Sequence, residues 1–184
     1  MSLLEQQKFL AQLFTNESLR HSFWENPHKI GVENDLNDEE IKQIKKIIEK
    51  DFNFFADSLY FKRLQEVEKL LPIVQKILGK QKFQQDFRMF SNSFLPKTVK
   101  KHLEDAIQFC KFLQLKNLLN EWQKEIVKFE SAKLQFFGYQ KRFVFLILHY
   151  DLSKTVENLA FEPEKKLGFA IWFRIGKTIK HYNF

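Results

Sequence analysis

The residues that most often do chemistry in proteins are present in this chain, but they form no known catalytic pattern. The five histidines are widely spaced, and no two lie three or four residues apart, as the ligands of a helical zinc site would. A metal site assembled in space from His149, Asp151 and His181 is conceivable, although such pairs arise easily by chance. The five glycines are scattered, so no glycine-rich phosphate loop occurs, and no serine lies in a nucleophile elbow. We therefore expect no catalytic residue, no cofactor and no metal.

Two isolated acids, Asp57 and Asp86, lie near apolar helix faces, so either could be partly buried, as a catalytic acid is. Capping or an ion pair, for example between Asp57 and Arg63, is the simpler interpretation. An enzyme with a site assembled from distant residues stays open as an alternative, because such a site leaves no local trace.

The single cysteine, Cys110, excludes an intramolecular disulfide and an all-cysteine zinc site. It lies among Ile107, Phe109 and Leu113, so we expect a small buried core residue. A reactive thiol would need an electropositive and accessible setting.

Charge is divided unevenly along the chain. Residues 1–51 contain 7 Lys/Arg and 10 Asp/Glu, a net charge of −3, whereas residues 52–184 contain 23 and 13, a net charge of +10. A genome rich in A and T would favour Lys codons evenly along the chain, so codon bias does not explain this division. The asymmetry indicates a binding partner of opposite charge.

The tail has the highest density of cations beside an aromatic residue. Trp172 and Arg174 would share one face of a strand, with Lys177 and Lys180 following closely, and these four are candidate partner- or anion-binding residues. Such a platform suits a phosphate, a nucleotide base or an acidic peptide. In the alternative interpretation Trp172 belongs to the core and the lysines form a solvated rim.

Cap signals and hydrophobic periodicity predict helices over most of the chain. Ser2 with Glu5, and Asn37 with Glu40, have the spacing of a capping box, in which each residue binds a backbone N–H of the other. Asn16 is expected to cap a second helix.

Other residues predict where helices end. The segment 28–36 reads as a loop, and Pro72 should kink a long helix over 52–78 near its last two turns, with Gly79 as its C-terminal cap. Thr98 is expected to cap a later helix. Further helical patterns cover residues 83–94, 99–113, 115–137 and 151–159, and whether 99–113 and 115–137 form one helix or two stays open.

The tail changes to a period of two, typical of strands. Ile171, Phe173 and Ile175 alternate with other residues, and Gly176 stands first in a two-residue turn, so we expect a β-hairpin. The apolar run Phe143–Leu148 is either a buried strand, which would be a third strand beside the hairpin, or the start of a helix.

These patterns predict a mostly α protein, a bundle of about six to eight helices with a small C-terminal β-hairpin. With 184 residues it fits one domain, subdivided as a helical pair (1–36), a helical bundle (37–138) and a mixed segment (139–184). The longest apolar run has six residues and Glu5 precedes any apolar run, so we expect no membrane span, no secretory signal and a cytoplasmic location.

Three stretches, residues 9–31, 55–79 and 168–184, resemble a group of small uncharacterised bacterial helical proteins. The residues that carry the resemblance are Ser58, Leu59, Lys62, Arg63, Leu70, Leu71 and Pro72. Proteins of that kind resemble accessory partners of multinuclear iron enzymes that modify ribosomally made peptides, and others are described as DNA-binding. The resemblance carries over no agreed site residues, and it makes Lys62 and Arg63 candidates for partner or anion binding.

Three functional hypotheses follow. The first is a non-enzymatic interaction or accessory module that uses its basic part to bind an acidic protein or peptide. The second is a nucleic-acid-binding protein, although Lys outnumbers Arg and no recognition helix is evident. The third is the enzyme considered above. The sequence leaves the oligomeric state open.

Overall fold

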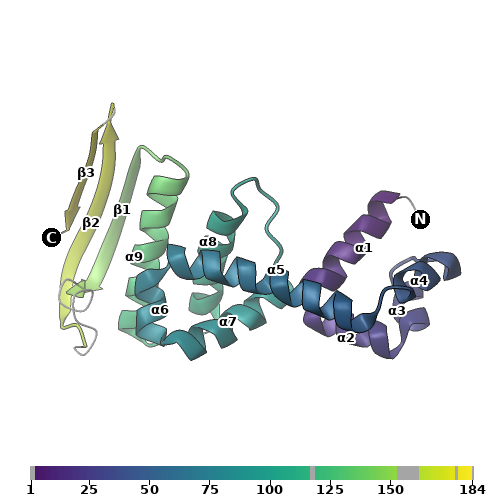
Figure 1. Cartoon of the computed structure of the whole chain (residues 1–184). Helices are drawn as coiled ribbons and strands as arrows, with labels where there is room; N and C mark the ends of the chain where they lie inside the picture. The colour runs from purple at the N-terminus through teal and green to yellow at the C-terminus, as the bar shows by residue number, and fades with distance from the viewer. Residues whose placement is uncertain (1–2, 117–118, 153–161, 177, 184) are drawn as a thin grey trace. The chain divides into compact units, whose positions relative to one another are not determined.

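Helices followed by a small antiparallel sheet make up the computed structural model, which describes residues 3–116, 119–152, 162–176 and 178–183 (Figure 1). The predicted fold class is confirmed. Within these residues the helices are α1 (Leu3–Thr15), α2 (Glu17–Glu25), α3 (Pro27–Glu33), α4 (Asp38–Lys45), α5 (Glu49–Leu70), α6 (Pro72–Leu78), α7 (Lys80–Ser93), α8 (Lys101–Leu115) and α9 (Glu121–Gly138). The strands are β1 (Phe143–Tyr150), β2 (Lys165–Ile175) and β3 (Thr178–Asn183). Ser2, Lys177 and most of the expected helix at 151–159 lie outside the described residues.

Asparagine caps begin several helices, two of them as predicted. The Asn16 side chain accepts a hydrogen bond from the N–H of Leu19, at 3.0 Å. The Asn37 side chain accepts one from the N–H of Glu40 at 2.9 Å, and the Glu40 carboxylate accepts one from the N–H of Asn37 at 2.8 Å. This reciprocal pair is the predicted capping box.

The segment 28–36 is not a loop, because α3 occupies most of it. The Asn26 side chain caps α3 by accepting a hydrogen bond from the N–H of Lys29, and proline occupies the first turn, where its missing N–H is no loss. Gly31 lies within α3, and glycine suits this position because a Cβ there would come within 2.5 Å of the Ile41 Cδ1 atom.

Two further local predictions need correction. Pro72 ends α5 and starts α6 instead of kinking one helix, so the number of helices exceeds the predicted range. Thr98 does not cap α8; its backbone N–H instead donates to Glu104, a residue of the first turn. The segments 99–113 and 115–137 belong to two helices, α8 and α9, and Gly79 ends α6 with φ +76° as predicted.

The chain forms two compact units. Unit 1 comprises residues 1–65 and 88–95, and unit 2 comprises residues 66–87 and 96–184. Two of the three boundaries between them fall within α5 and α7, and the third lies between α7 and α8.

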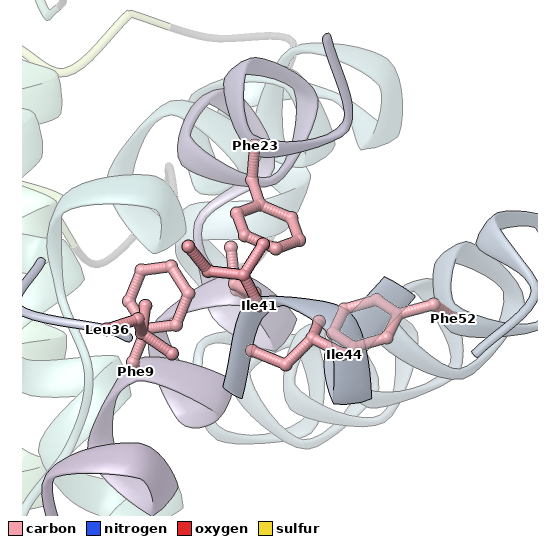
Figure 2. Close-up of a cluster of buried hydrophobic side chains, with 7 residues drawn as sticks. Phe9, Phe23, Leu36, Ile41, Ile44 and Phe52 are labelled. Atoms are coloured by element: carbon pink, nitrogen blue, oxygen red, sulfur yellow. The ribbon is translucent and has the colours of Figure 1, made fainter. Parts of the chain in front are cut away.

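Unit 1 is built around a cluster of buried aromatic and aliphatic side chains from α1, α2, α4, α5 and the segment between α3 and α4 (Figure 2). The cluster consists of Phe9, Leu13, Phe23, Leu36, Ile41, Ile44 and Phe52. Phe14 stacks on Phe52 with ring centroids 4.2 Å apart, which extends the cluster along α5. Burial of this many large side chains holds the helices together, since α2 and α4, with 9 and 8 residues, are too short to be stable alone.

Beside this core, a buried arginine links three segments of unit 1. The Arg20 Nε atom donates to the Asn53 side chain at 2.8 Å, and Nη1 donates to the Leu13 carbonyl at 3.0 Å. Asp57, for which Arg63 was the suggested partner, lies 4.0 Å from Arg20 instead. Desolvation lowers the pKa of Arg20, against the raising effect of nearby Asp57.

Unit 2 packs α7, α8 and α9 through aromatic residues and then adds the sheet. Phe83 and Phe87 contact the ring of Phe109 edge-on, with centroids 5.2 and 5.3 Å apart. Cys110 is fully buried, as predicted, and burial raises the pKa of its thiol. Asp86 is buried and pairs with Lys82 at 2.9 Å, so the ion-pair interpretation of this acid is confirmed.

The sheet confirms the predicted hairpin and contains the third strand that the sequence left open. Its strands follow the order β1-β2-β3 and are antiparallel throughout. Gly176 has φ +59°, the left-handed value that a two-residue hairpin turn requires of its first central residue. Figure 1 shows α9 lying directly beside the sheet, next to β1, and α9 also contacts α6 and α8.

Candidate interaction surface on the C-terminal sheet

The register of the strands assigns each side chain to one of two faces. Phe145 pairs with Ile171, which pairs with Tyr182, so these three lie on the same face. Val144 pairs with Trp172, which places both on the opposite face. We call the face that packs against α9 the inner face and the other the outer sheet face.

The inner face belongs to the core of unit 2. Trp172 is 1% exposed, lies 5.3 Å from the ring of Phe129 in α9, and stacks on His181 at 4.7 Å. The guanidinium of Arg174 lies over the Phe136 ring at 5.7 Å. The predicted pairing of Trp172 and Arg174 on one face is therefore confirmed, but α9 covers that face, and Trp172 is the core residue of the alternative interpretation.

The outer sheet face is apolar and uncovered. Seven of its side chains keep between 38% and 75% of their surface exposed: Phe143, Phe145, Ile147, Leu167, Phe169, Ile175 and Tyr182. Ile171 and Phe173 lie between them and are partly buried by these neighbours. Two aromatic pairs order the surface, Phe145 with Phe169 at 6.1 Å and Phe173 stacked on Tyr182 at 6.0 Å. In Figure 1 no described element of unit 2 lies on this side of the sheet.

The electrostatic setting of this face is positive. Lys180 pairs with Phe173 across β2 and β3 and so lies on the outer sheet face itself. None of the three strands contains Asp or Glu, and Lys165 and Lys166 begin β2. Lys166 lies 3.9 Å from Asp151. Unit 2 contains 20 Lys/Arg and 12 Asp/Glu, a net charge of +8, whereas unit 1 contains 10 and 11, a net charge of −1.

The structure brings together only some of the residues that the sequence singled out. Lys180 is on the outer sheet face, Arg174 is on the inner face, and Lys177 lies outside the described residues. Lys62 and Arg63 belong to unit 1, where Lys62 is exposed and Arg63 donates to the Phe94 carbonyl at 3.0 Å, just after α7 ends. Arg63 therefore has a structural role in completing the end of that helix.

Sequence reasoning missed the exposed aromatic residues of the outer sheet face. A signal for them was present in the run Phe143–Leu148, where residues of both alternating positions are apolar. A strand with one solvated face would alternate between apolar and polar residues. The run predicts a buried strand or the start of a helix, whereas in the structure alternate residues of β1 are exposed.

The residues of the conceivable metal site do not assemble. The Nδ1 atom of His149 lies 3.5 Å from the Glu125 carboxylate, Asp151 pairs with Lys166, and His181 stacks on Trp172. Among the described residues no group of three or more His, Cys, Asp or Glu side chains is placed to hold a metal ion.

Unit 2 also contains a groove of about 460 Å³. Leu103, Leu134 and Phe137 line it, with Lys133 among its polar residues and Glu130 as the acid. Both oxygens of Glu130 accept backbone N–H groups of α6, at 3.1 and 2.8 Å. Burial raises the pKa of Glu130, against the lowering effect of these two hydrogen bonds. The carboxylate thus holds the start of α6 to α9, which leaves no free acid for catalysis in this lining.

Within the residues described, no helix has the length and apolar character to cross a membrane. A comparison with protein families found none that matches the chain, and a comparison with curated protein sequences found no relative. The resemblance to accessory partners of iron enzymes accordingly stays a prediction.

Proposed function

We propose that this protein is a non-enzymatic interaction module whose outer sheet face binds an acidic protein or peptide partner. The observation that carries the proposal is the uncovered apolar face, set in a unit of net charge +8.

The area of the face supports a stable interface. With about 200 Å² for a full aromatic side chain and less for Ile or Leu, its seven exposed apolar side chains offer on the order of 700 Å². One partner of a standard protein–protein interface contributes about 800 Å², and the largest apolar patch of a typical monomer is about 300–600 Å². The face is therefore larger than solubility tolerates without a role.

The charges support an acidic partner. Lys180 lies on the face, and the three strands contain no acid that would repel a negative ligand. A partner with the same positive charge would be disfavoured, because like charges brought together across an interface cost binding free energy.

Two matched pairs of variants test the proposal. Phe145→Asp changes a side chain that is 49% exposed on the outer sheet face, and Phe61→Asp changes one that is 51% exposed in unit 1. Lys180→Glu and Lys62→Glu form the charge-matched pair, both starting from exposed lysines. Partners are captured on the wild-type protein after nuclease treatment, identified by mass spectrometry, purified, and titrated against all five proteins.

The outer-face variants should each lose at least about tenfold in affinity for a purified acidic partner, as expected for residues at the centre of an interface. The unit 1 variants should change it less than about threefold, which corresponds to well under 1.4 kcal/mol. Equal losses in both units, or a partner without net negative charge, would contradict the proposal.

We propose nucleic-acid binding as a second candidate, favoured by the stacked pair of Phe173 and Tyr182 on an open sheet. Aromatic side chains on such a surface stack on single-stranded bases. Against it, among the described residues the register places one cation, Lys180, between the apolar side chains of this face, whereas phosphate binding needs several. Retention of a fluorescent single-stranded oligonucleotide at about 50 mM salt, lost steeply as salt rises, would favour this candidate over the first.

A further inference from the structure

Strand β1 and the middle of β2 have the composition of strands that are covered on both faces. In β1 the residues Val144, Leu146 and Leu148 pack inward, and the alternate residues Phe143, Phe145 and Ile147 point outward and are equally apolar. Such continuous apolar runs are typical of sheets with helices on both sides. Here α9 supplies one covering helix, and no described element of unit 2 supplies the other.

The dimensions of the outer sheet face suit a second helix. Three strands about 4.8 Å apart present a face about 15 Å wide, and a helix with its side chains is about 10 Å in diameter. The 11 residues of β2 extend about 36 Å at 3.3 Å per residue. The 18 residues of α9, which cover the inner face, extend about 27 Å.

Two other ways of using this surface are less favourable. A partner strand added at the edge of β1 or β3 would widen the sheet but would not cover its face. At one end of β1 the N–H of His149 already donates to the Glu125 carboxylate, at 3.2 Å. A second copy of this chain would bring two units of net charge +8 against each other.

We infer that the partner segment is an amphipathic α-helix that lies across the outer sheet face and completes a helix–sheet–helix sandwich. This inference rests on the function proposed above. The apolar stripe of the helix contacts Phe145, Phe169 and Phe173, and Asp or Glu residues beside the stripe lie near Lys180.

Photo-crosslinking in the cells that make the protein tests this inference. Phe145 is replaced by the photoreactive residue p-benzoylphenylalanine in the full chain, and Phe61 is replaced in the same way as the control of equal exposure. Mass spectrometry then identifies the crosslinked peptide. We expect the Phe145 position to capture a segment with apolar residues at positions i, i+3 or i+4 and i+7, flanked by acids, that the Phe61 position does not capture.

A proline placed in the middle of the captured segment provides the second measurement. It should weaken binding to the wild-type protein at least tenfold, because proline breaks a helix interior at a cost of about 3 kcal/mol or more. An alanine at the same position, if it is a solvent-facing one, should have little effect.

The outcomes separate this inference from the proposed function. Capture of an acidic protein through an extended segment, or binding that tolerates the proline, would overturn the helical partner and leave the interaction module standing. Crosslinks to a second copy of the chain, to nucleic acid or to lipid, or no capture specific to Phe145, would overturn both.

Discussion

Single substitutions on the two faces of the C-terminal sheet should have very different effects on stability. Trp172→Ala removes a side chain that is 1% exposed, and Phe145→Thr shortens one that is 49% exposed on the neighbouring strand. If the outer sheet face is uncovered in the free protein, the first change costs much more folding free energy than the second.

The magnitudes follow from buried area. A fully buried Trp side chain removes about 250 Å² from water, which at about 25 cal/mol per Å² sets an upper estimate of about 6 kcal/mol, and such truncations cost about 3–5 kcal/mol. Phe145 buries about half of 200 Å², of which Thr retains about half, so its replacement should cost about 1 kcal/mol. Threonine also keeps the strand preference of the position.

Urea denaturation followed by far-ultraviolet circular dichroism measures both variants against the wild type. The Trp172 variant should have the clearly lower midpoint. Equal losses, or a larger loss for Phe145→Thr, would refute the assignment of the faces, because they would mean that Phe145 is packed inside the free protein.

Three further predictions concern single residues. Asn37→Ala removes the acceptor of the Glu40 N–H and should lower stability by about 1 kcal/mol in urea, whereas Asn37→Asp should not. Burial raises the pKa of Glu130 above its ordinary 4.5, so the folded chain binds this proton more tightly than the unfolded chain does. The free energy of unfolding should therefore fall as pH rises from 4.5 through the raised pKa. Glu130→Gln should flatten that fall in urea midpoints measured across pH; parallel curves would contradict it. The Cys110 thiol should react with a disulfide reagent only after unfolding, so equal rates in water and in urea would contradict its burial.

Local signals were predictable from the sequence because their causes lie within a few residues. The pair Asn37 and Glu40 forms its capping box across three positions, and Gly176 adopts the turn that its place between two strands requires. Pro72 was recognised as an interruption for the same reason, although the helix ends there instead of bending.

Features that depend on distant residues were missed. Gly31 suggested a loop, but its role is to let α3 approach Ile41 of another helix. Trp172 and Arg174 were chosen by residue type, whereas their accessibility is decided by Phe129 and Phe136 of α9, about forty residues earlier. Alternation indicates that a strand has two faces, but only the packing of α9 decides which face is left open for a partner.

The position of the boundaries inside α5 and α7 limits how the protein can be dissected. A fragment ending at residue 65 would lack Arg88, which pairs with Glu17 at 2.9 Å, and Asn92, which accepts the Glu17 N–H at 3.2 Å. A cut at that residue would also sever a continuous helix. Truncation is therefore a poor way to isolate the sheet for binding work, and point variants of the intact polypeptide are the sound alternative.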